Sequence, residues 1–246
     1  MARGLIRIGC AGWALRKESA DAYPPPGTHL ERYARHFNAV EINSSFYRPH
    51  RRGTYERWGA SVPADFRFAV KVPKAVTHAA RLADTKAALE RFLGEAGGLG
   101  DKLGPLLIQL PPRLAFDASV AGTFFATLRQ LFAGDVVCEP RHAAWFGGEA
   151  ARLFRKFHVA RADADPPPAA ATEAADFGHV RYYRLHGSPR MYYSAYTPES
   201  LAALATRLQQ TARSGREVWC IFDNTAAGAA LDNALQLQSL VEPRAD

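Results

Sequence analysis

Charged side chains directly follow an apolar run in the stretch Val136–Trp145, which reads VVCEPRHAAW. Its first three residues have the composition of a strand covered on both faces. Glu139, Arg141 and His142 then arrive within four positions. Alternate residues of a strand share a face, so Glu139 and Arg141 are predicted to point one way and His142 the other. A structural ion pair and one wall of a ligand site both explain this pattern, because an unpaired buried charge is costly.

Polar residues also recur where other strand-like segments end. In a barrel of parallel strands these ends meet at one mouth, where barrel enzymes keep their sites. The candidate catalytic residues are Glu139, Glu41 and His186. The candidate ligand-binding residues are Asn43, Tyr47, Lys71, His78, Gln109, Arg141, His142, Trp145, Asp163, Arg184, Asp223 and Asn224. The competing interpretation is a set of paired polar side chains that seals the end of the barrel.

The elements that must position these residues alternate along the chain. The predicted strands are Leu5–Trp13, Ala39–Tyr47, Phe66–Pro73, Leu106–Pro112, the run that begins at Val136, Val159–Asp163, Val180–Gly187 and Glu217–Asn224. The predicted helices are His29–Phe37, Thr54–Ala60, Leu82–Leu93, Val120–Leu131, Glu149–Phe157, Pro198–Ala212 and Ala226–Leu240, with a glycine-rich turn at Gly94–Gly100. This alternation predicts an α/β protein, a single (β/α)8 TIM-type barrel with eight parallel strands, as one domain over residues 1–246. The Pro/Ala-rich segment Asp165–Ala175 lacks a helix start, so the sixth helix is expected to be missing or replaced by a loop.

The two-residue period predicts which side chains share a face within a strand. Tyr182, Arg184 and His186 fall on one face of theirs. We predict that Glu139 turns toward the barrel axis and that Cys138 packs outward against the helices.

The composition allows a large core and favours anionic partners. The 246 residues are 48% hydrophobic, and the formal net charge is +7. A basic protein attracts phosphate esters or nucleic acid, although arginines that only solubilise the surface give the same balance.

The cysteines and the apolar segments indicate where the protein resides. Cys10, Cys138 and Cys220 are odd in number, have no C-x-x-C spacing and lie in apolar runs, as expected of buried thiols in a reducing compartment. The first residues contain no signal-peptide apolar segment, and no run reaches the ~18 apolar residues that span a bilayer. We therefore expect a soluble, cytoplasmic protein without a membrane partner.

Seven short motifs occur in a characteristic order. They are G-C-A-G-W, V-E-I-N-S-S-F-Y, F-A-V-K-V-P followed by Thr77-His78, L-I-Q-L-P-P, E-P-R-H-A-A-W-F, R-L-H-G and F-D-N. Together they resemble the YecE-like family of barrel proteins, a domain of unknown function, over nearly the whole chain. The resemblance implies a TIM-type barrel and supplies no reaction. The last motif often reads F-N-N in that family, whereas Phe222-Asp223-Asn224 adds a carboxylate here.

The candidate residues as a set suit an anionic ligand. Lys71, Arg141, Arg184 and His186 offer donors for carboxylate or phosphate oxygens. A glutamate at the mouth, Glu139 or Glu41, would act as the acid or base. We predict an enzyme that acts by acid–base chemistry on a small phosphate- or carboxylate-bearing ligand, with no cofactor.

Two alternatives stay open. Glu41, Glu139, Asp163, His186 and Asp223 are residue types that hold divalent metal in nucleases and isomerases of the xylose-isomerase barrel type. No H-x-H or H-E-x-x-H spacing occurs, and Lys and Arg alternate with the carboxylates, which disfavours a cation. The second alternative is a nucleic-acid-binding protein that stacks bases on aromatic side chains past the strand ends.

The segment around Met191-Tyr192-Tyr193 follows one of these strand ends closely. It fits a lid or a fixed apolar cap over the barrel. The oligomeric state is left open by the sequence.

Overall fold

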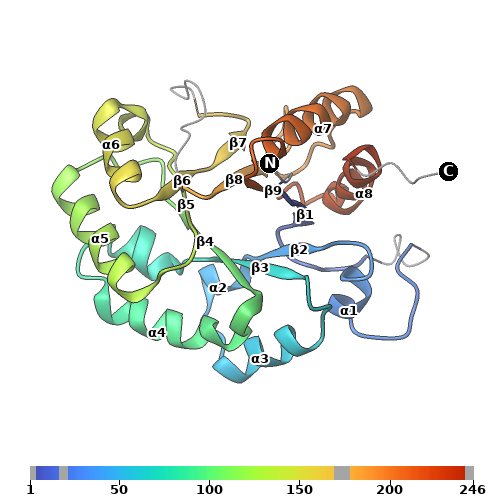
Figure 1. Cartoon of the computed structure of the whole chain (residues 1–246), viewed down its shortest axis with the longest axis horizontal. Helices are drawn as coiled ribbons and strands as arrows, with labels where there is room; N and C mark the ends of the chain where they lie inside the picture. Colours follow the sequence, from blue (N-terminus) through green and yellow to red (C-terminus); the bar gives the residue numbers. More distant parts are fainter. Residues whose placement is uncertain (1–3, 17–21, 169–177, 242–246) are drawn as a thin grey trace.

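The computed structural model describes residues 4–16, 22–168 and 178–241, which form an α/β fold with parallel strands and helices around them (Figure 1). The strands are β1 Ile6–Cys10, β2 Ala39–Ile42, β3 Arg67–Lys71, β4 Leu103–Gln109, β5 Val136–Glu139, β6 Val159–Arg161, β7 Asp163–Asp165, β8 Val180–Leu185 and β9 Glu217–Phe222. The α-helices are α1 His29–Tyr33, α2 Ser44–Tyr47, α3 Arg52–Ala60, α4 Lys86–Ala96, α5 Ala118–Leu131, α6 Gly148–Lys156, α7 Pro198–Ala212 and α8 Ala229–Val241. A π-helical turn spans Ala75–Ala79, and 3₁₀ turns span Gly97–Lys102 and Ala143–Phe146.

The strands form two parallel sheets, in the orders β1-β9-β8-β7 and β2-β3-β4-β5-β6. The predicted closed barrel of eight strands is therefore not confirmed. The edge strands β1 and β2 of the two sheets are joined, within the described chain, by one isolated parallel bridge between Ala11 and Glu41. At the other junction the predicted strand Val159–Asp163 is divided at Ala162, so that β6 pairs with β5 and β7 pairs with β8.

Each sheet buries both faces, as parallel sheets do. An outer hydrophobic cluster lies between strands and helices and includes Cys138, as predicted. An inner cluster draws on both sheets and consists of Ala39, Ala69, Leu107, Val137, Ala160, Ala162, Val180, Tyr182, Trp219 and Ile221. Val137 lies in this inner cluster, so alternation carries the side chain of Glu139 to the same side, as predicted.

Local sequence signals determine where helix α7 begins. Helix α7 has the predicted bounds and begins at Pro198, with Thr197 as its N-cap. The buried leucines of this helix, Leu201, Leu204 and Leu208, have the helical spacing of a single apolar face.

Several predicted boundaries were wrong, among them the following two. The strand predicted over Ala39–Tyr47 ends at Ile42, and α2 follows directly. Ser45 explains the turn, since its hydroxyl oxygen lies 3.0 Å from the main-chain oxygen of Ile42 and 2.6 Å from that of Lys71, and its single proton can be donated to either. The predicted glycine-rich turn over Gly94–Gly100 is instead the end of α4 and a 3₁₀ turn. The expectation of a missing sixth helix falls partly on residues 169–177, outside the described ranges.

Candidate functional site

The guanidinium of Arg184, near the carboxyl end of β8, is the centre of a buried ion cluster. Its side chain is fully buried. Nη2 lies 2.7 Å from Oε1 of Glu41 and 3.0 Å from Oδ2 of Asp223. Nη1 donates to Oε2 of Glu139 at 3.1 Å, and Nε donates to Glu41 at 3.0 Å. All three nitrogens are thus engaged by carboxylates from β2, β5 and the end of β9, so Arg184 positions these groups.

Glu41 gains one more donor, which the sequence prediction did not include. The hydroxyl of Tyr182 donates to Oε2 of Glu41 at 2.8 Å, and both side chains are fully buried. The signal was present, because Tyr182 shares its strand face with Arg184.

His186 connects the carboxylates of Glu139 and Asp223. Nε2 lies 3.1 Å from Oε1 of Glu139, and Nδ1 lies 3.1 Å from Oδ2 of Asp223. Arg141 contacts the same Glu139 oxygen, and its Nη2 lies 2.6 Å from Nε2 of His186. Nε2 of His186 therefore has a partner in either protonation state: it accepts from Arg141 when neutral and donates to Glu139 when protonated.

The cluster sets the charge of its members. Burial alone would raise the pKa of Glu139, but Arg184 and Arg141 hold it well below its usual range. Burial likewise opposes ionisation of Asp223, yet Arg184 lowers the pKa of that carboxyl. The pKa of His186 is raised, because hydrogen bonds to Asp223 and Glu139 outweigh its burial. Glu139 and Asp223 are therefore ionised at neutral pH, and His186 holds a proton more readily than a free imidazole.

A cavity of about 540 Å³ lies beside this cluster, at the carboxyl ends of β2, β3, β4 and β9. Its lining residues are Asn43, Phe46, Tyr47, Lys71, His78, Gln109, Tyr192, Tyr193, Asp223, Thr225 and Ala226. Six predicted ligand-binding residues are therefore brought together here, and Asp223 is shared with the ion cluster.

Lys71 reaches the cavity from β3. Its side chain is buried, and its ammonium lies 4.4 Å from the centre of the Phe46 ring. Burial, reinforced by the charge of Arg184, lowers the pKa of Lys71 to about 8. The ring of His78 packs edge-to-face with that of Phe46, with the ring centres 5.0 Å apart. Burial and the charge of Lys71 lower the pKa of His78, which favours its neutral form.

Glu41, Glu139 and Arg184 lie behind the cavity rather than on its wall. Glu41 and Arg184 are fully buried, and Glu139 is 1% exposed. None of the three is among the residues that line the cavity. Their side chains contact one another and those of Asp223, Tyr182, Arg141 and His186.

Four other predicted residues lie apart from the cavity. His142 caps the turn Ala143–Phe146 by accepting from the N–H of Ala144 at 3.1 Å. The Trp145 side chain is buried in the outer cluster, where its indole donates to the oxygen of Leu114 at 2.9 Å. Asp163 follows Ala162 of the inner cluster, so alternation places its side chain on the opposite face of the strand. There its Oδ2 lies 2.8 Å from Nη2 of Arg181.

Asn224, the fourth, holds the segment that follows β8. Its Nδ2 donates to the main-chain oxygen of Ser194 and to Oδ1 of Asn233, each at 3.0 Å. Further main-chain bonds link Tyr192 to His186 and Ala226 to Tyr192. The segment around Met191-Tyr192-Tyr193 is thus tied at several points and forms one wall of the cavity.

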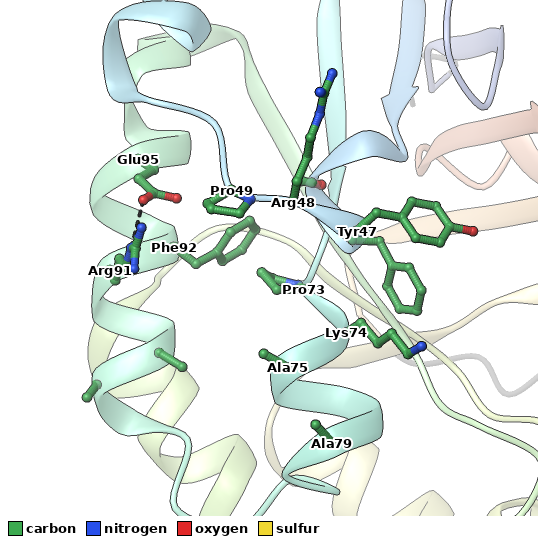
Figure 2. A pocket seen from close by; sticks show the side chains of 14 residues that line it. Tyr47, Arg48, Pro49, Pro73, Lys74, Ala75, Ala79, Arg91, Phe92 and Glu95 are labelled. Atoms are coloured by element: carbon green, nitrogen blue, oxygen red, sulfur yellow. Dashed lines mark hydrogen bonds and ion pairs between the residues drawn. The ribbon is translucent and has the colours of Figure 1, made fainter.

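An apolar groove of about 640 Å³ adjoins the cavity on the far side of α2 (Figure 2). Pro49, Pro73 and Phe92 line it, and Arg91 bonds to Glu95 along α4 at its edge. Phe46 and Tyr47 line both hollows, and Tyr47 is 76% exposed.

Three further features bear on the alternatives. Across the described ranges, no three His, Cys, Asp or Glu side chains are grouped so that they could hold a metal ion. Cys10 is buried, and burial raises the pKa of its thiol to about 12, which disfavours a thiolate nucleophile. In the same ranges no helix is long and apolar enough to cross a membrane.

Comparisons with known proteins agree on one family. A family model described as "Protein of unknown function DUF72" matches residues 7–246. The UPF0759 protein YunF of Bacillus subtilis is 24% identical, over 97% of this chain and 95% of its own length. The UPF0759 protein YecE of Escherichia coli K12 is 37% identical over 84 residues, so that the match spans 34% of this chain and 31% of YecE.

Solved structures support the fold. A DUF72 family protein from Thermotoga maritima has a TM-score of 0.81 at 22% identity, covering 96% of this chain and 99% of that one. A DUF72 family protein from Enterococcus faecalis has a TM-score of 0.80 at 20% identity, covering 98% and 97%. At such identities the likeness concerns the fold alone.

Proposed function

Since the chain belongs to the DUF72 family, whose description supplies no activity, we propose from the site itself that it is an enzyme acting on a small anionic ligand by acid–base chemistry. The observation that carries the proposal is the position of Lys71. This lysine lines a cavity of ligand size while the neighbouring carboxylates are bound by Arg184 and Arg141. Among the described residues no carboxylate forms an ion pair with Lys71, and a buried cation of this kind favours an anionic ligand.

Asp223 and Lys71 are the proton-transfer groups in this proposal, with His186 behind Asp223. They fit the role expected of Glu139 or Glu41 better than those glutamates do, because both line the cavity. The pKa of Lys71 near 8 also suits proton transfer at neutral pH. Glu41, Glu139 and Arg184 then serve as the rigid charged support of Asp223 and His186.

The proposal treats residues 1–246 as one catalytic domain in which the two sheets act as one barrel-type scaffold. Side chains of both sheets in the inner cluster and in the Arg184 cluster support it. A cytoplasmic location is part of the same proposal.

Anion titration tests the function. Oxalate and inorganic phosphate are titrated calorimetrically into the wild type, Lys71→Met and the control Lys86→Met, whose lysine is exposed and outside the cavity. A charged hydrogen bond contributes about 1.5–3 kcal/mol, so Lys71→Met should bind roughly 10- to 150-fold more weakly. Equal affinity in wild type and Lys71→Met, or no binding of either anion, would refute the proposal.

Nucleic-acid binding is the second candidate, favoured by one observation. The exposed Tyr47 stands between the cavity and the groove, and Arg48 and Lys74 line the groove beside it (Figure 2). An aromatic side chain with nearby cations suits a single strand. Binding of oligonucleotides over a salt series tests it, because phosphate contacts must weaken steeply with salt. Absence of binding at low salt would remove this candidate.

A further inference from the structure

Lys71 is a buried amine on the wall of the cavity. Its side chain is 5% exposed, yet within the described part of the chain no carboxylate lies within ion-pair distance of its nitrogen. Glu41, Glu139 and Asp223 are held by Arg184, Arg141 and His186 instead. Its ammonium lies over the ring of Phe46, 4.4 Å from the ring centre.

This environment disfavours the charged form of the amine. Burial and the positive charge of Arg184 act in the same direction on Lys71. At neutral pH an amine with a pKa of about 8 is therefore neutral far more often than an ordinary lysine. Desolvated lysines next to another cation are the ones that attack carbonyl groups.

The groups around the amine suit an oxo acid. Asn43 and Gln109 line the same cavity and offer amide donors for carboxylate oxygens. Oδ1 of Asn43 is buried and has no hydrogen-bond partner within the described ranges, so it can accept from a hydroxyl group on the reacting carbon. Asp223 faces the cavity and is bonded to His186.

We propose that Lys71 is the amine nucleophile of this site and forms an imine with a small 2-oxo acid. The inference rests on the proposed function and names its substrate class. The neutral amine attacks the carbonyl carbon, and a C–N bond forms while the carbonyl oxygen takes up the proton lost by nitrogen. The resulting hydroxyl group leaves as water with a proton from the His186–Asp223 pair. The nitrogen lone pair closes the C=N bond, which leaves a protonated imine next to ionised Asp223.

Reductive trapping tests the inference. The wild-type protein is treated with glyoxylate and cyanoborohydride at pH 7, and the modified lysines are identified by peptide mass spectrometry. The chain has Lys17, Lys71, Lys74, Lys86, Lys102 and Lys156, so each site is resolved. We expect a carboxymethyl group mainly on Lys71, at least tenfold faster than on the exposed Lys74 and Lys86, with protection by oxalate. Lys71→Arg, which retains the charge, should lose the fast reaction, whereas Lys86→Arg should retain it.

The outcomes separate this inference from the function on which it rests. Oxalate binding without preferential modification of Lys71 would overturn the imine and leave the anion site standing. If all exposed lysines are modified at equal rates and Lys71 is not modified, the imine is likewise overturned and the anion site remains. If the protein neither binds oxalate nor forms a Lys71 adduct, both proposals are overturned. Should Lys71→Arg not fold, oxalate protection of Lys71 in the wild type decides the matter.

Discussion

Arg184 offers the sharpest test of the buried ion cluster. Arg184→Met retains much of the side-chain volume but leaves Glu41, Glu139 and Asp223 without their shared cation. Removing one partner of a buried pair costs about 3–5 kcal/mol. For a chain of this length, that loss corresponds to a melting temperature lower by roughly 6–20 °C.

The pH dependence of the loss carries a definite sign. In the wild type the pKa values of Glu139 and Asp223 are depressed. Their ionised forms therefore stabilise the folded state at pH values above the ordinary carboxyl pKa, and this contribution is lost as the pH falls below that value. Without Arg184, Arg141, His186 and Lys71 offset less of the cost of burial, so the pKa values of both carboxyl groups should rise. The difference in unfolding free energy between wild type and variant should therefore shrink between pH 7 and pH 5.

Urea unfolding at pH 7 and pH 5 measures both quantities. Arg91→Met is the matched control, because its pair with Glu95 is on the surface, where such pairs contribute about 0–1 kcal/mol. If Arg184→Met does not fold, the double variant with Glu41→Gln removes one excess charge and should recover part of the stability. A loss below about 1 kcal/mol at pH 7, or an equal loss at both pH values, would refute the interpretation of Arg184 as a shared counter-ion.

Three further predictions concern single residues. Glu139→Gln should lower the unfolding free energy by about 3–5 kcal/mol and leave oxalate affinity in the folded fraction unchanged, because Glu139 does not line the cavity; a tenfold change in affinity measured by calorimetry would contradict this. Trp145→Ala should cost about 3–5 kcal/mol in urea unfolding without altering oxalate binding, and a normal stability would exclude its packing role. Oxalate affinity should fall as pH rises through about 8, where Lys71 loses its charge, and a profile flat to pH 10 would count against Lys71 as the binding cation.

The sequence by itself determined the direction of individual side chains. Tyr182, Arg184 and His186 were expected on one strand face, and all three are buried in the site. Glu139 lies on the inner side and Cys138 in the outer cluster, as predicted. Such directions follow from the two-residue period of a strand, which is a local property and can be counted along the chain.

The tertiary structure decided which charges are paired and which remain open. Glu41 and Arg184 are separated by 143 positions, and only the arrangement of the two sheets brings them to 2.7 Å. Lys71 and Arg184 were expected to have the same role, yet Arg184 pairs with three carboxylates, whereas Lys71 forms no ion pair within the described chain. Pairing depends on register and packing between segments distant along the chain, so no local period encodes it. For the same reason Trp145 was expected at the ligand and lies in the core, because the partners that bury it come from β4–α5 and α6 rather than from its own motif.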